Sequence, residues 1–327
     1  MIFIEADSKE AAFYFACEEY FMQHINEPVL MIWQTNPCVM LGRYQIAAAE
    51  IDLNYAQKIG MQIVRRPSGG GTIFTDPGTL LYSFIRPDWK PETARKTVAG
   101  LVVKSLQELG VNAEAKGRND ILIRGRKIAG LAQHRQYSKL CCHGSMLFDA
   151  DLEMLTRVLQ VDNEKIISKA IPSVRSRVCN INDHIQIEDF KKIFTNRLVV
   201  NCQAQKYTLS DNEIKKINVI RIEKYNNPTW TYGETPRFTF HNSKRFEGGK
   251  IEIFLDVKNN IIVSCKIYGD FLGIAPVQEL ESLLEGQIFT QQSINNAICT
   301  QTLQYSLGSI TKEQFLLCIF DYSHNPS

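Results

Sequence analysis

The apolar residues of the chain fall into two kinds of pattern. Short runs rich in β-branched and aromatic residues, bounded by turn-forming residues, are typical of strands. Apolar residues spaced three or four apart are typical of helices. The predicted strands are residues 29–33, 38–42, 61–64, 79–85, 121–123, 143–149, 250–256 and 261–268. The predicted helices are residues 7–24, 91–109, 152–159, 163–168, 187–198, 210–224, 276–284, 291–299 and 311–321.

The order of these elements predicts two domains. Strands and helices are mixed along residues 1–244, whereas residues 245–327 contain two strands joined at Lys258–Asn260 and then helical segments only. Such a set is enough for a small module with its own core. We therefore expect a large α+β domain over 1–244 and a small α+β domain over 245–327.

Composition places the protein among ordinary globular chains. With 44% apolar and 22% charged residues in 327, it is neither disordered nor fibrous. No stretch reaches membrane-spanning length, and residues 1–7 lack the start of a signal peptide, so we expect a cytoplasmic protein that does not associate with membranes. Nine cysteines without metal-ligand spacing agree with a reducing compartment. The basic residues are concentrated in motifs, which argues against a nucleic-acid partner.

A glycine-rich segment, Arg65–Gly78, carries the clearest chemical signal. Three consecutive glycines, Gly69–Gly71, indicate backbone at positive φ or an approach too close for a Cβ atom. Successive exposed amides form anion sites, and Arg65 and Arg66 add fixed positive charge before them. The segment therefore predicts an anion cradle. The alternative reading is a flexible surface turn.

Two further motifs add polar groups. Asn119 and Asp120 supply a neutral donor and a carboxylate of the kind found in magnesium–nucleotide sites, although Asp120 alone also fits a turn. Lys127 enters a segment of small residues that can partly enclose its stem, although a lone lysine is usually a solvated surface group. His143, predicted to begin a strand, fits either a substrate contact or a structural histidine, and the latter is favoured without a metal partner at suitable spacing.

Taken together, five motifs resemble the motif series of lipoate-protein ligases. The resemblance covers nearly the whole chain, and the five occur in the family's order. One departure is Tyr44–Ile46, where the family commonly has Asn-Gln-Asn. The motifs are Arg65–Thr72, Gly117–Asp120, Lys127–Gln133, His143–Gly144 and Ser173–Val178.

This resemblance implies a biotin-ligase-like mixed sheet flanked by helices, with a small C-terminal accessory domain. It implies activation of lipoate by MgATP to lipoyl-AMP, followed by transfer to a lysine of a lipoyl domain of a 2-oxoacid dehydrogenase E2 subunit or of the glycine-cleavage H protein. Lys127 is the implied catalytic residue, and Asp120 is the candidate Mg²⁺ ligand. The implied ATP-binding residues are Arg66, Gly71, Thr72, Ile73, Phe74, Asn119 and Lys127. The implied lipoate-binding residues are Lys127, Arg65, Ser68, Gly69, Gly70 and His143.

Three other functions are compatible with parts of the sequence. A cysteine-dependent octanoyl or lipoyl amidotransferase shares the expected fold, and Cys141, Cys142 and Cys179 are available as nucleophiles. The retained Gly117–Asp120 motif favours the ATP-dependent ligase over it. A biotin ligase would carry a Gly-Arg-Gly-Arg signature, which is absent. A non-catalytic carrier-binding protein would not need the full set of charged residues.

Overall fold

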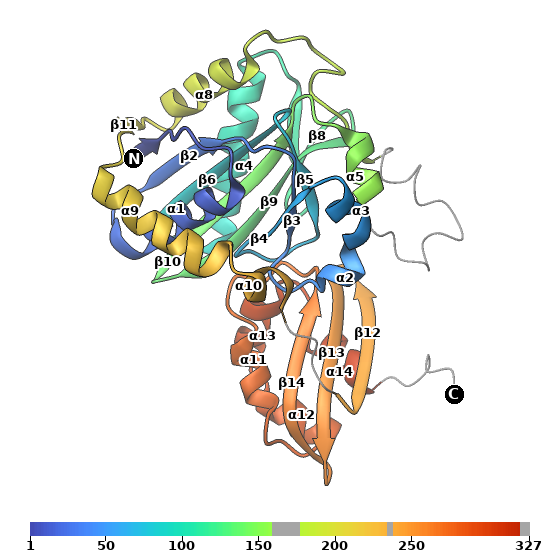
Figure 1. The fold of residues 1–327 in the computed structure, drawn as a ribbon. Helices are drawn as coiled ribbons and strands as arrows, with labels where there is room; N and C mark the ends of the chain where they lie inside the picture. Colours follow the sequence, from blue (N-terminus) through green and yellow to red (C-terminus); the bar gives the residue numbers. More distant parts are fainter. Residues whose placement is uncertain (159–176, 234–237, 321–327) are drawn as a thin grey trace. The chain divides into compact units, whose positions relative to one another are not determined.

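The computed structural model describes residues 1–158, 177–233 and 238–320 (Figure 1). The chain forms two compact units. The first unit comprises residues 1–41, 47–66 and 72–231, and the second comprises residues 42–46, 67–71 and 232–327. The predicted helix over 163–168 and residues 173–176 of the basic motif lie outside the described residues.

A mixed eight-stranded sheet is the centre of the first unit. Strand β1 is parallel to both of its neighbours, and the other pairings are antiparallel. This confirms the predicted α+β class, with a mixed sheet flanked by helices. In spatial order the strands are β11 (Gln205–Tyr207), β1 (Ile2–Ile4), β2 (Val29–Trp33), β6 (Thr79–Pro87), β10 (Lys139–Leu147), β9 (Arg126–Gln136), β8 (Asp120–Ile123) and β7 (Ala113–Lys116).

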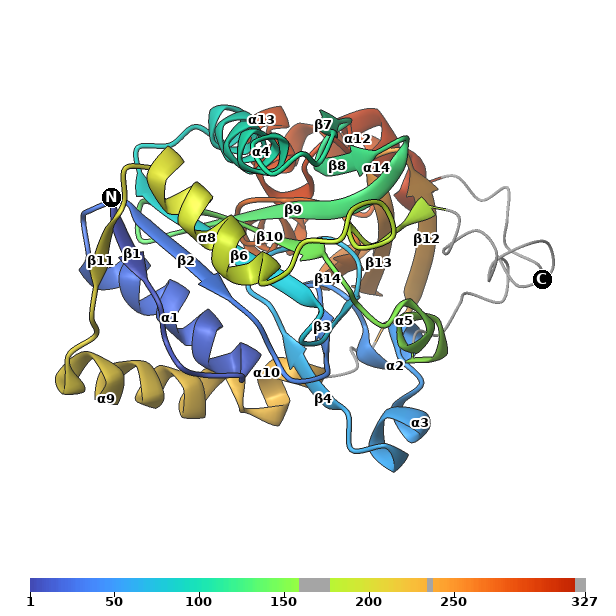
Figure 2. The ribbon, with the colours of Figure 1, turned by 90° about the horizontal axis from the view of Figure 1, so that it is seen from above.

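Helices cover both faces of this sheet (Figure 2). In β2, Met31 and Trp33 pack with α1 (Ala11–His24), whereas Leu30 and Ile32 pack with α4 (Pro91–Gln107) and α8 (Phe190–Asn201). Successive side chains of a strand point to opposite faces. Strand β2 is therefore apolar at every position because both of its faces are buried.

Asp7 and Glu10 have the spacing of a capping box and predict one at the start of helix α1, but that prediction is wrong, and the helix is held by packing. The helix begins at Ala11, and Glu10 is its N-cap without a side-chain hydrogen bond to the helix. Every residue from Ala11 to Met22 is buried. Since burying one large apolar side chain contributes about 1.5–3 kcal/mol, this packing outweighs a missing cap worth about 1 kcal/mol.

Helix α9 (Asp211–Ile220), in contrast, does begin with a capping box. The Ser210 hydroxyl accepts from the amide of Glu213, and the Glu213 carboxylate accepts from the amide of Ser210. The helix continues as the π-helical turn η1 (Arg221–Tyr225), and α10 (Pro228–Tyr232) follows. The predicted helix over 210–224 is thus confirmed, with one change of helical type near its end.

A second, three-stranded sheet belongs to the same unit. Its strands are β4 (Gln62–Arg65), β3 (Cys38–Leu41) and β5 (Ile73–Thr75), with β3 parallel to β4 and antiparallel to β5. Its apolar side chains, among them Val39 and Phe74, share a small core with the short helices beside it. Those helices are α2 (Ala47–Glu50), α3 (Leu53–Lys58) and α5 (Leu152–Val158).

Within its described residues, the second unit pairs an antiparallel sheet with four helices around its own core. The turn between β13 and β14 has positive φ at Asn259 (50°) and Asn260 (62°), which matches the right-handed twist of a two-residue hairpin. The prediction omitted β12 and α13. The elements are β12 (Phe240–Phe246), β13 (Gly249–Lys258), β14 (Ile261–Gly269), α11 (Gln278–Leu284), α12 (Gln291–Ala297), α13 (Thr300–Leu307) and α14 (Lys312–Phe320).

Tyr44, where the sequence departs from the family, belongs to the core of the second unit. Its ring stacks on Phe271 with centroids 5.1 Å apart, and its hydroxyl donates to the Ala275 carbonyl. The departure is therefore accounted for by packing.

The domain boundary between residues 244 and 245 stays a prediction. None of the described helices combines the length and the apolar character needed to cross a membrane.

Two glycines provide opposite tests of this packing. A Cβ at Gly144 would lie 2.5 Å from the Tyr82 hydroxyl and 2.7 Å from the Gly130 carbonyl oxygen, whereas a Cβ at Gly100, an exposed residue of α4, meets nothing within 4 Å. We expect Gly144→Ala to lower the free energy of unfolding by about 1–3 kcal/mol through overpacking. Gly100→Ala should raise it by up to about 1 kcal/mol through helix propensity.

Denaturant unfolding followed by tryptophan fluorescence measures both effects, since Trp33, Trp89 and Trp230 all lie in the first unit. Equal effects of the two alanines would contradict the packing described here.

Candidate active site

The hairpin formed by β8 and β9 positions Lys127 and Asp120. Its two turn residues, Arg124 and Gly125, have φ of 50° and 78°, the combination that a tight two-residue hairpin requires. Asp120 is the first residue of β8 and Lys127 is the second residue of β9. The turn thereby brings together two residues that the sequence analysis assigned to one site.

Lys127 and Asp120 form an ion pair with Nζ 2.6 Å from Oδ1. The two side chains are 35% and 39% exposed, so both remain accessible to a ligand. A Cβ atom at Gly130 would lie 3.0 Å from Cε and Nζ of Lys127. The small residues predicted to accommodate the lysine therefore do so at this position, and Lys127 is not a fully solvated surface group.

Neighbouring backbone contacts fix the hairpin in place. The side-chain amide of Asn119 donates to the Leu131 carbonyl at 3.1 Å, and the Leu131 amide donates to the Asn119 carbonyl at 2.9 Å. On the other side, the Cys179 amide donates to the Lys127 carbonyl at 3.0 Å, next to the bridge between Lys127 and Val178. The described end of the basic motif thus borders β9 at Lys127.

Arg66 supplies a buried positive charge at the end of β4. It is 6% exposed, and its Nη1 donates to the Met40 carbonyl at 3.0 Å. Burial, and then the charge of Arg65, lower the pKa of Arg66 to about 10. The guanidinium is still charged at neutral pH, but its charge is poorly solvated, and a bound phosphate would stabilise it.

Arg65 has a different environment. Its Nε donates to the carbonyls of Trp230 and Thr231, at 3.0 and 2.9 Å, and the Trp230 indole donates to the Arg65 carbonyl at 2.9 Å. These contacts attach β4 to α10. Sequence reasoning missed them, because 165 residues separate the partners and no local pattern marks the pairing.

The three glycines of the segment have different local environments. Gly70 has φ of 92°, which confirms the expected positive φ. A Cβ at Gly69 would collide with the Phe271 carbonyl oxygen, so the close neighbour there is the second unit's own backbone and not a ligand. Ser68 is also buried, whereas Gly71 is exposed with open space around it.

Thr72 and β5 follow this segment in the first unit. Thr72 and Ile73 are half-buried, and the Phe74 side chain is packed in the core of the small sheet at 6% exposure. Phe74 therefore has only its backbone to offer a ligand, which is the role the family resemblance implies for it.

The sequence analysis predicted His143 at the start of a strand, but it lies in the middle of β10. The prediction failed because buried Lys139 and the cysteines before His143 extend the strand. His143 is 6% exposed, and its Nδ1 is 2.9 Å from Oε1 of Glu18 in α1. This buried hydrogen bond agrees with the structural role favoured for the histidine.

The three cysteines considered as nucleophiles lack activation. Cys141 and Cys142 are fully buried, and burial raises the pKa of Cys142 to about 12 and that of Cys141 well above its ordinary value. Burial also raises the pKa of Cys179. Because the thiolate is the nucleophile, these environments disfavour a cysteine-dependent transferase.

Alkylation kinetics test this distribution of reactivity. Cys299 is exposed, and amide hydrogen bonds from Thr302 and Gln301 lower its pKa. Under native conditions iodoacetamide should therefore label Cys299 first, with a rate that levels off at a lower pH than for an ordinary thiol. Peptide mass spectrometry should find Cys141 and Cys142 labelled only after unfolding. Native labelling of either residue as fast as Cys299 would show an activated thiol that the structure does not account for.

Comparison with known proteins agrees with this geometry. Residues 10–199 match the family model of the lipoyl protein ligase A/B catalytic domain, and residues 235–319 match that of the bacterial lipoate protein ligase C-terminus. The chain is 37% identical to the lipoate-protein ligase LplJ of Bacillus subtilis over 317 residues, which cover 93% of this chain and 95% of that protein.

Two solved structures share the fold. A bipartite lipoate protein ligase from Thermoplasma acidophilum, described with its E2 lipoyl domain, is 26% identical with a TM-score of 0.65, covering 73% of this chain and 98% of that one. A lipoate-protein ligase A bound with ATP is 25% identical with a TM-score of 0.63, covering 71% and 98%. The chain therefore belongs to the family of lipoate-protein ligases, which are ATP-dependent ligases.

Proposed function

We propose that this protein activates lipoate with ATP to lipoyl-AMP and transfers the lipoyl group to a lysine of a carrier domain. The observation that carries this proposal is the partly exposed ion pair of Lys127 and Asp120. It provides a cation and a potential metal ligand at one place, within the segment that matches the catalytic family model.

The first step joins two anions, so it needs positive charge. A carboxylate oxygen of lipoate attacks the α-phosphorus of ATP, and the bond to the departing pyrophosphate breaks. Lys127 remains protonated and lies between the acyl and phosphoryl oxygens, where its charge reduces their repulsion and stabilises the developing negative charge. The proposed nucleotide-binding residues are Arg66, Gly71, Thr72, Ile73, Phe74, Asn119 and Lys127.

A magnesium ion fits the chemistry of this site. Mg²⁺ in nucleotide sites takes one or two carboxylates together with water and phosphate oxygens. Asp120 offers a carboxylate that is 39% exposed, and it is the residue we propose to hold the ion. The bound metal would reduce the charge of the phosphates.

For lipoate, we propose that Lys127 binds the carboxylate. The other proposed contacts follow the family motifs and are Arg65, Ser68, Gly69, Gly70 and His143. In the second step the ε-amine of the acceptor lysine attacks the acyl carbonyl carbon. An amide bond forms, AMP leaves, and the amine releases a proton. This order keeps the reactive anhydride bound until the acceptor arrives.

The acceptor is proposed to be a lipoyl domain of a 2-oxoacid dehydrogenase E2 subunit or the glycine-cleavage H protein. The Thermoplasma ligase described with its E2 lipoyl domain supports the first of these. We further propose a cytoplasmic location, with which nine free cysteines agree. Residues 1–244 would hold the ligase chemistry and residues 245–327 would form the accessory domain, as the positions of the two family models support.

Replacement of Lys127 tests the proposal. Lys127→Ala should abolish release of pyrophosphate from ATP and lipoate in the absence of an acceptor, because it removes the positive charge proposed to lie between the reacting oxygens. The loss should be at least about 100-fold, the effect of removing one electrostatic stabiliser of a transition state. Pyrophosphate release is followed with the purified full-length protein.

Lys96→Ala is the matched control. Lys96 is an exposed lysine of α4 that pairs with Glu92 of the same helix, and its removal should leave pyrophosphate release unchanged. Circular dichroism verifies that both variants are folded. Full pyrophosphate release by folded Lys127→Ala would exclude the proposed role of the lysine.

A further inference from the structure

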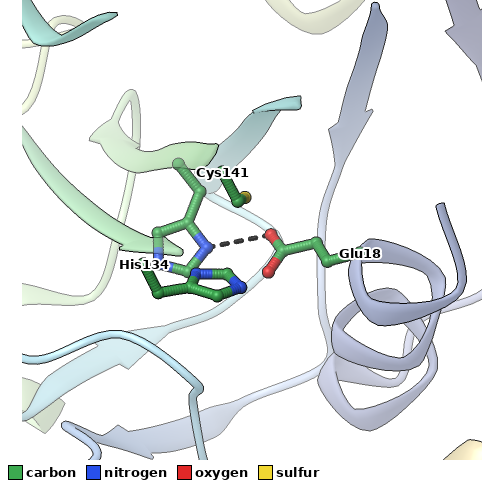
Figure 3. A group of neighbouring side chains, drawn as sticks. Glu18, His134 and Cys141 are labelled. Carbon is green, nitrogen blue, oxygen red and sulfur yellow. Dashed lines mark hydrogen bonds and ion pairs between the residues drawn. The ribbon is translucent and has the colours of Figure 1, made fainter. Parts of the chain in front are cut away.

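Four side chains of the types that bind metals in proteins lie between α1 and the sheet face that it covers. His134 of β9 and Cys141 of β10 are direct partners in the antiparallel pairing, so both side chains point to the same face. His143 is two residues beyond Cys141 and shares that face. Glu18 approaches from α1 on the same side, as Figure 3 shows for its position relative to His134 and Cys141.

These four groups are close together and closed off from solvent. One ligand atom from each of Glu18, His134, Cys141 and His143 lies within 4.8 Å of all the others. Among them, Nδ1 of His143 lies 2.9 Å from Oε1 of Glu18. Glu18 and Cys141 are fully buried, and the two histidines are 5% and 6% exposed. No other group of this kind occurs among the described residues.

Glu18 has one oxygen that is satisfied and one that is not. Oε1 accepts from the Ser83 hydroxyl at 2.6 Å and contacts His143, and Ser83 in turn accepts from the Trp33 indole at 3.2 Å. Oε2 is buried without a hydrogen-bond partner among the described residues. A buried carboxylate with an unsatisfied oxygen is costly unless a cation is near it.

We propose that Glu18, His134, Cys141 and His143 bind one Zn²⁺ ion between α1 and the sheet. The inference goes beyond the proposed ligase function. It assigns Glu18, His134 and Cys141 a role that lipoate activation does not use, and it gives His143, one of the contacts implied by the family motifs, a structural role in place of a lipoate contact.

The ligand set suits zinc in type, number and charge. Zinc in proteins is tetrahedral and takes thiolate, imidazole and carboxylate ligands. With metal–ligand bonds of about 2.0–2.3 Å, neighbouring ligand atoms of a tetrahedral site are about 3.4 Å apart. The separations here are at most 4.8 Å, and the one between His143 and Glu18 is 2.9 Å, so small side-chain movements complete the site.

Charge balance favours the ion as well. Coordination requires Cys141 to lose its thiol proton to solvent, while the histidines bind as neutral imidazoles. One thiolate and one carboxylate then neutralise the two positive charges of the metal, which lowers the cost of burying each of them. Four protein ligands leave no open position, which is typical of structural zinc sites.

Cobalt substitution tests the site directly. Full-length protein, stripped with a chelator and kept free of ATP and lipoate, is titrated with Co²⁺ alone. We expect one equivalent to bind, with the visible bands of tetrahedral cobalt and a thiolate-to-cobalt charge-transfer band. Zn²⁺ should displace it and should raise the unfolding temperature relative to the stripped protein.

Two cysteine variants provide a matched comparison. Cys141→Ser should lose the charge-transfer band, whereas Cys142→Ser should keep it, because Cys142 is equally buried but packs on the opposite sheet face. X-ray absorption of the zinc-loaded wild type, expected to show one sulfur among nitrogen and oxygen ligands, gives the same answer if Cys141→Ser does not fold. Failure of the wild type to bind Co²⁺, or an unchanged charge-transfer band in folded Cys141→Ser, would overturn the proposal.

Discussion

The antiparallel pairing of β9 with β10 is the constraint on which the rest of the first unit depends. It places His134 opposite Cys141 and Gly130 opposite Ser145, with Gly144 beside them. Both faces of these strands are covered by helices. A shift of the register by one residue would exchange the faces of every side chain, so burial on both sides fixes the register. The buried cluster at Glu18 depends directly on this pairing, and the β8–β9 hairpin that carries Lys127 is joined to the sheet through it.

The same strand serves two chemical environments. Near its start, β9 presents Lys127 in a partly exposed ion pair beside a tight turn. Seven residues later it presents His134 inside the core under α1. The residue for which we propose contact with a charged substrate therefore lies near the hairpin turn, and the packed centre of the sheet holds that hairpin in position. A rigid support of this kind helps to position a flexible lysine side chain.

The sequence predicted the parts of this fold that are governed by local patterns. Strand β2 was predicted at its observed bounds, because a strand buried on both faces is an uninterrupted apolar run. Strands β7 and β11 were missed, since they are edge strands whose side chains are mostly exposed and polar. Helix α13 was missed because most of its residues are polar, so its few apolar residues form too short a helical pattern to recognise.

Contacts between residues far apart in the chain could not be predicted from the sequence, for a physical reason. Asp120 and Lys127 belong to two neighbouring motifs of the family, so the resemblance associated them, and the β8–β9 hairpin brings them together. Glu18 and His143 are 125 residues apart, and their contact exists only because α1 packs on the sheet. The same applies to Arg65, which sequence reasoning placed in an anion cradle and whose Nε the structure shows bonded to carbonyls of α10. Contacts of this kind are set by topology and not by spacing.

Exchange of labelled pyrophosphate into ATP is the most direct test of the central claim, that the protein forms an acyl-adenylate from lipoate. The exchange reports the reversible first step alone and needs no acceptor. We expect exchange that depends on lipoate and does not occur with biotin. Absence of exchange with lipoate, in protein that still transfers a lipoyl group through a thioester on a cysteine, would contradict it.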